Sequence, residues 1–170
     1  MGGRRGRDRD GESLPDAPMT GAPREKLAAR DRIDRSRARA WVLQILYRHE
    51  AEDRERPLHD VLAGVARTRR IAESRLPMIQ RILTLLDDHE AEIDEALTGA
   101  TRNWRLDRLS RIDRSILRLG AAELLFSPDV PGPVAIQESV RLAERYGGNE
   151  SAGFVNGVLD AVYRTCDSSS

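Results

Sequence analysis

The chain has 170 residues, enough for one domain with a tail or for two small subdomains, and 39% of them are hydrophobic. Its 28 basic and 28 acidic residues cancel. A single cysteine, Cys166, excludes an internal disulfide and a cysteine metal cluster, and with no secretory signal or membrane-spanning apolar run it predicts a cytoplasmic protein.

The charge balance hides an asymmetry along the chain. Residues 1–48 carry twelve basic and seven acidic residues, and the remainder carries the opposite excess of five. A basic N-terminal region followed by an acidic remainder is compatible with binding of a polyanion such as nucleic acid. A solvated tail that binds nothing explains the same pattern equally well. Residues 1–33 combine Gly, Pro, Asp and Arg without apolar periodicity, which predicts a disordered tail.

The first predicted helix covers residues 34–52 and starts with three arginines, Arg35, Arg37 and Arg39. Cations at a helix N-terminus oppose the helix dipole, so their presence there favours a functional role. Tyr47 follows on the same helix. Charge beside an aromatic ring is typical of single-strand binding, although a core or rim position for Tyr47 is the more ordinary interpretation.

Two further helices are predicted over residues 57–70 and 77–100, each opened by a proline. The polar side of the second is acidic around His89. Metal ligands have these side-chain types, but nothing in the spacing brings them to one inward face, so we interpret them as a solvated helix face.

The central helix is predicted over residues 110–125, with Ser110 as its N-cap and a cationic side opposite its apolar stripe. Trp104 and Leu106 before it are expected to fill the gap between two subdomains. A helix over 134–146 follows, then a last helix that starts near Phe154 and contains Val162, and residues 166–170 are expected to fray. The predicted fold is an all-α compact bundle of about seven helices, with subdomains at 34–100 and 101–165.

Motifs for catalysis are missing from the chain. The three histidines fit neither a nucleophile nor a zinc-helix spacing, and no glycine-rich phosphate loop occurs. The sequence therefore predicts a binding protein without enzymatic activity, cofactor or metal.

Several blocks resemble the NusB family of transcription antitermination factors. The most specific one runs Ser-Ala-Gly-Phe-Val-Asn-Gly-Val-Leu-Asp over residues 151–160. Similar blocks are Asp-Val-Pro at 129–131, Val-Ala-Ile-Gln-Glu at 134–138 and Asp-Arg-Ser-Ile-Leu-Arg-Leu at 113–119. The resemblance extends from about Arg35 to Val162.

The resemblance implies a two-subdomain helical protein that binds the boxA element of nascent ribosomal RNA transcripts. Family members do so with the small-subunit ribosomal protein NusE and join the elongating RNA polymerase complex. By position, the resemblance assigns Asp113 and Arg114 to the protein partner, and it assigns to RNA the residues Arg35, Arg37, Arg39, Tyr47 and Phe154.

Two questions stay open at this level. Phe154 could be a core residue or a platform on which a base stacks. The chain could also be a helical protein-interaction module, or a homodimer, that binds no RNA of its own.

Overall fold

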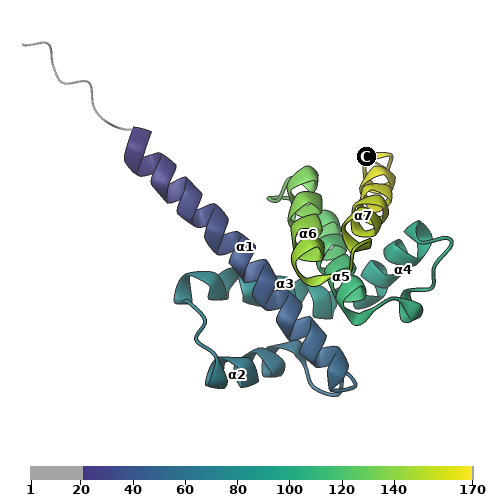
Figure 1. The fold of residues 1–170 in the computed structure, drawn as a ribbon, viewed down its shortest axis with the longest axis horizontal. Helices are drawn as coiled ribbons and strands as arrows, with labels where there is room; N and C mark the ends of the chain where they lie inside the picture. Colours follow the sequence, from purple (N-terminus) through teal and green to yellow (C-terminus); the bar gives the residue numbers. More distant parts are fainter. Residues whose placement is uncertain (1–20, 170) are drawn as a thin grey trace, which may run out of the picture.

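The computed structural model describes residues 21–169, and these form seven α-helices, two short 3-10 turns and no strand (Figure 1). The predicted all-α fold is therefore confirmed for this part of the chain. The elements are α1 (Gly21–Ala51), α2 (Leu58–Thr68), η1 (Glu73–Arg75), α3 (Leu76–Asp88), α4 (Glu90–Ala100), η2 (Leu106–Arg108), α5 (Arg111–Phe126), α6 (Gly132–Tyr146) and α7 (Ser151–Asp167).

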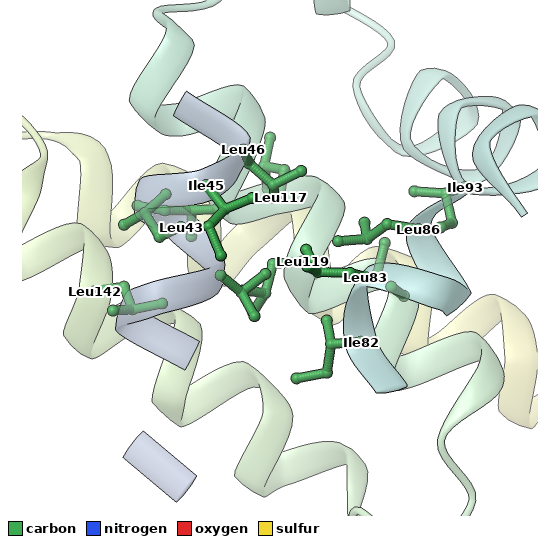
Figure 2. Close-up of a cluster of buried hydrophobic side chains, with 14 of the residues drawn as sticks. Leu43, Ile45, Leu46, Ile82, Leu83, Leu86, Ile93, Leu117, Leu119 and Leu142 are labelled. Carbon is green, nitrogen blue, oxygen red and sulfur yellow. The ribbon is translucent and has the colours of Figure 1, made fainter. Parts of the chain in front are cut away.

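Helix α5 is the centre of the bundle. It packs against α1, α3 and α4 on one side and against α6 and α7 on the other. Its start follows the predicted cap, because the Ser110 hydroxyl accepts a hydrogen bond from the Asp113 amide at 3.1 Å. The buried side chains of these helices form one continuous apolar core, and Figure 2 shows the part where leucines and isoleucines of α1, α3 and α5 meet. The division into two subdomains stays a prediction.

Close packing around α5 depends on a small residue. A Cβ atom at Gly120 would lie 2.6 Å from the Leu159 side chain and 2.6 Å from the Ser139 hydroxyl. Both neighbours are fully buried, so α6 and α7 can approach α5 this closely only where it has no side chain.

Helix α1 begins thirteen residues before the predicted start at Asp34, and this corrects our expectation of a disordered tail for residues 21–33. The segment lacks an apolar stripe but contains Arg, Glu, Lys, Leu and Ala, which have high helix propensity. It continues a helix that the core already nucleates, and it projects beyond the body of the molecule (Figure 1). Residues 1–20 of the predicted tail lie outside the described residues.

The predicted long helix over 77–100 is two helices, which is a second correction. His89 leaves the helical conformation, at φ −121° and ψ 23°, between α3 and α4. Its ring stacks on Phe126 at the end of α5, with the centroids 3.7 Å apart. This long-range contact overrides a sequence pattern that would allow one continuous helix.

Two smaller expectations are also wrong. Trp104 does not fill a gap between subdomains, since 62% of it is exposed. At the other end of the chain, α7 continues to Asp167 rather than fraying from residue 166.

Candidate nucleic-acid interface

A groove of about 1010 Å³ lies between the N-terminal half of α1 and helix α6. Arginines from both helices line it, with two acidic residues, Asp31 and Glu138, and a small apolar patch around Val134. The lining arginines are Arg32, Arg35, Arg37, Arg39, Arg141 and Arg145. Six arginines from two helices against two carboxylates make this groove strongly basic.

Arg39 is the exception among these arginines, because it belongs to the interior. It is 2% exposed, and its Nε donates to Glu123 Oε2 at 2.8 Å. Glu123 on α5 is fully buried, and a second carboxylate, Glu138 on α6, lies 4.0 Å from the Arg39 guanidinium. The expected contact of Arg39 with RNA is therefore corrected: this side chain holds α1 against α5 and is not presented to a ligand.

Glu138 connects the two walls of the groove. It accepts a hydrogen bond from the Ser36 hydroxyl at 2.7 Å and pairs with Arg141 on its own helix at 3.2 Å. The backbones of α1 and α6 do not pack closely against each other, so these side chains bridge a space that stays open above them.

Arg35 and Arg37 are both exposed, as expected for residues that contact a ligand. Successive residues are rotated by about 100° around a helix axis. Arg35 and Arg37 therefore lie on opposite sides of the stripe of α1 that faces α6 and contains Ser36 and Arg39. Arg35 pairs with Asp31 at 3.1 Å on the surface, whereas no described acidic side chain pairs with Arg37. A surface ion pair of this kind stabilises the protein by only about 0–1 kcal/mol, so the Arg35 guanidinium can leave Asp31 and bind a phosphate. The Arg37 guanidinium can bind a phosphate directly.

The remaining predicted RNA residues lie elsewhere. Tyr47 is 42% exposed, but it follows Arg37 by ten residues, which is about 15 Å along a helix, and it does not line the groove. Phe154 lines a separate depression of about 500 Å³ at the starts of α5 and α7. Arg35 and Arg37 therefore line the same groove from opposite sides of α1, whereas Tyr47 and Phe154 lie outside it.

The Phe154 depression has an aromatic and acidic character. Trp104 meets Phe154 edge to face, with the ring centroids 6.1 Å apart. Asp113 and Glu150 line the same space, and no basic residue does. Phe154 is half-buried and packs partly against the core, so it combines the two roles that its sequence position left open. The depression also unites an expected RNA residue, Phe154, with an expected partner residue, Asp113.

Arg114, the second expected partner residue, is largely occupied within the molecule. Its guanidinium binds the Glu50 carboxylate at 2.7 Å and donates to the carbonyls of Leu106 and Leu109. Arg118 joins the same network through Glu50, at 2.6 Å, and through Asp94. Burial alone would raise the pKa of Glu50, but the hydrogen bond from Arg114 and the charges of both arginines outweigh it and lower that pKa below its ordinary value.

Sequence analysis overlooked two acidic residues that organise these sites, Glu123 and Glu50. A signal existed for the first. Ile116 and Leu119 lie on the buried stripe of α5, and Glu123 continues it four residues after Leu119. Arg39 likewise precedes Val42 on the buried stripe of α1. An arginine and a glutamate on two buried stripes predict a buried pair, because neither charge is tolerated there alone.

Two absences apply to residues 21–169. No cluster of His, Cys, Asp and Glu there could hold a metal ion, and the acidic side chains around His89 are mostly exposed. None of the helices in this range is both long and apolar enough to cross a membrane.

Comparison with known proteins agrees with these features. The profile of the NusB family matches residues 36–164. A transcription antitermination protein NusB from Sorangium cellulosum is 43% identical over 129 residues, which cover 75% of this chain and 90% of that protein.

Solved structures show the same fold. NusB of T. maritima superposes with a TM-score of 0.70 at 33% identity, covering 76% of this chain and 90% of that one. A structure of antitermination factors NusB and NusE in complex with double-stranded RNA superposes with a TM-score of 0.69 at 26% identity, covering 78% and 97%. The relatives are named for transcription rather than for a reaction, in agreement with the expected lack of enzymatic activity. The chain belongs to the NusB family of transcription antitermination proteins.

Proposed function

We propose that this protein binds the boxA element of nascent ribosomal RNA together with the ribosomal protein NusE, and that it joins the elongating RNA polymerase complex. The observation that carries the proposal is the groove between α1 and α6, where Arg35 and Arg37 stand exposed. Backbone phosphates supply most of the affinity in such complexes, and guanidinium groups bind them in a bidentate way. Such a role places the protein in the cytoplasm with the transcription machinery.

A relative in complex with NusE and RNA supports the same assignment, since this chain superposes on it over most of its length. The RNA in that complex is double-stranded. Our proposal concerns a single strand, because a splayed strand exposes base faces to aromatic rings.

We propose that the protein partner contacts the depression around Phe154. Asp113 is the polar group best placed for it, since it lines this depression beside Phe154 and Trp104. Arg114 acts indirectly, because it fixes the turn Leu106–Arg108 that leads into α5. Phe154 itself offers one ring face to an unpaired base.

A binding experiment tests the proposal. Fluorescence anisotropy of labelled single-stranded boxA RNA is measured with the full chain, with and without NusE, beside a scrambled strand and a duplex. We expect the boxA strand to bind more tightly than the scrambled strand, and NusE to increase its affinity. If the chain binds NusE or itself but no RNA under either condition, it is a protein-interaction module instead.

A Phe154→Ala variant tests the stacking role in the same assay. Loss of a stacked base costs about 1–3 kcal/mol of RNA binding. A purely structural phenylalanine would instead cost about 3–5 kcal/mol of stability and leave the affinity of the folded fraction unchanged.

A further inference from the structure

The first turns of α1 lie outside the region that defines the family. The family match begins at Ser36, whereas α1 begins at Gly21. Fifteen residues of helix therefore precede the part of the chain that matches the family, and this end of α1 projects from the body of the molecule (Figure 1).

This extension supplies one wall of the groove. Arg32 lies one turn before Ser36, whose hydroxyl binds Glu138, so Arg32 is on the α6-facing side of α1. Ala29 and Ile33, also from the extension, line the groove as well. Without residues 29–35 the α1 wall of the groove would keep only Ser36, Arg37 and Arg39.

Helix α6 supplies a matching wall. Val134, Glu138, Arg141 and Arg145 recur at spacings of three and four, and all four line the groove. Arg141 is paired with Glu138, but Arg145 has no acidic partner among the described residues and only covers the ring of Tyr146, at 5.3 Å. Arg32 is likewise exposed and unpaired in the described part of the chain.

We propose that Arg32 and Arg145 form a second phosphate-binding site, which extends the RNA path beyond Arg35 and Arg37 and holds single-stranded RNA that flanks the boxA element. This inference rests on the proposed function. Two unpaired cations on facing walls of one groove fit an anionic chain that passes between them.

The site is suited to the RNA backbone and not to the bases. Besides the arginines, the groove is lined by exposed aliphatic side chains, Ile33 and Val134, and by a few polar ones, and no aromatic ring lines it. Base stacking needs such a ring. Base edges are recognised by polar groups, and the polar side chains Ser36 and Glu138 of this groove are already bound to each other. The flanking RNA should therefore be bound whatever its sequence.

The experiment compares two RNAs, boxA alone and boxA with ten-nucleotide uridine flanks on both sides. Salt dependence of binding is measured for the full-length protein and for the double variant Arg32→Gln, Arg145→Gln. For a single strand each neutralised phosphate adds about 0.7 to the slope of log affinity against log salt. We expect the flanked RNA to show a slope steeper by about 1.4 with the wild-type protein, and the double variant to remove this difference.

Controls separate this inference from the proposed function. Arg67→Gln on α2, an exposed arginine outside the groove, should leave both slopes unchanged. Arg37→Gln should weaken binding of both RNAs. If Arg37→Gln weakens both RNAs but the double variant changes neither, the extension is not an RNA site and the proposed function stands. If the wild-type protein binds neither RNA, the proposed function fails and the inference fails with it.

Replacing the uridine flanks by adenosine flanks should preserve the steeper slope, and loss of it would contradict backbone recognition.

Discussion

At the scale of single residues, the buried pair between Arg39 and Glu123 decides how α1 sits on the bundle. Both side chains lie inside the core, and their hydrogen bond is 2.8 Å long. The apolar surroundings make each charge dependent on the other, since an unpaired charge cannot be solvated there. Arg35 and Arg37, the arginines proposed to bind RNA, are carried by the same helix, so their position follows from this pair.

Removing one partner of the buried pair of Arg39 and Glu123 should therefore destabilise the protein strongly. We expect Glu123→Ala to lower the free energy of unfolding by about 3–5 kcal/mol, because it leaves Arg39 buried and uncompensated. The surface pair of Arg35 with Asp31 is the matched control, and Asp31→Ala should cost at most about 1 kcal/mol. Urea unfolding measures both. Equal effects of the two substitutions would show that the buried pair does not fix α1.

Also at the scale of single residues, the Glu50 carboxylate makes a pH-dependent contribution to the free energy of unfolding. Its pKa in the folded protein is lower than the ordinary value of 4.5, so the unfolded chain binds the proton more readily. This stabilisation is present above about pH 4.5, and it is lost as the pH falls through the pKa of Glu50 in the folded protein. We expect stability curves of wild-type protein and Glu50→Gln to differ most near pH 7 and to converge below pH 4.5. Curves that stay parallel down to acid pH would refute this role of Glu50.

At the scale of elements, the interface of α5 with α6 and α7 depends on Gly120. A Gly120→Ala substitution places a methyl group 2.6 Å from Leu159 and from the Ser139 hydroxyl. Overpacking of this kind costs about 1–3 kcal/mol. At Gly153 on α7 a Cβ would meet nothing within 4 Å, so Gly153→Ala should stabilise the protein by up to about 1 kcal/mol. Thermal melting of the two variants should shift in opposite directions; a shift of the same sign in both would contradict the packing argument.

The sequence predicts most elements well because their apolar residues recur with helical periodicity. Helices α2, α5 and α6 start and end close to the predicted residues, and the Ser110 cap forms as expected. The early start of α1 could not be seen in this way, because an exposed helix has no apolar stripe. The break at His89 depends on its stacking with Phe126, a contact between residues distant in sequence.

The site was predictable in part, for a related reason. Exposed arginines can be recognised from charge alone, and Arg35 and Arg37 are exposed as expected, although they lie fourteen and sixteen residues into α1 and not at its start. Whether an arginine in the same run faces inward depends on the neighbouring helix, and Arg39 does so because Glu123 of α5 receives it. The facing wall on α6 requires the tertiary fold, since Arg141 and Arg145 are about a hundred residues away in the chain.

At the scale of the whole molecule, the charge asymmetry of the sequence becomes a spatial one. Residues 21–48, the described part of the basic N-terminal region, lie in α1, and α6 adds two arginines across the groove. Much of the acidic excess lies on the exposed sides of α3 and α4. A polyanion is therefore attracted to one region of the surface. The central claim is that this region, and not the depression at Phe154, supplies the electrostatic part of RNA binding.

The most direct test is the salt dependence of boxA RNA binding for wild-type protein and for the double variant Arg35→Gln, Arg37→Gln. Arg39 is left intact because it is buried. If each replaced arginine neutralises one phosphate, the slope of log affinity against log salt should flatten by about 1.4, with the melting temperature nearly unchanged. An unchanged slope in the folded variant would place the RNA site elsewhere on the molecule and contradict the account.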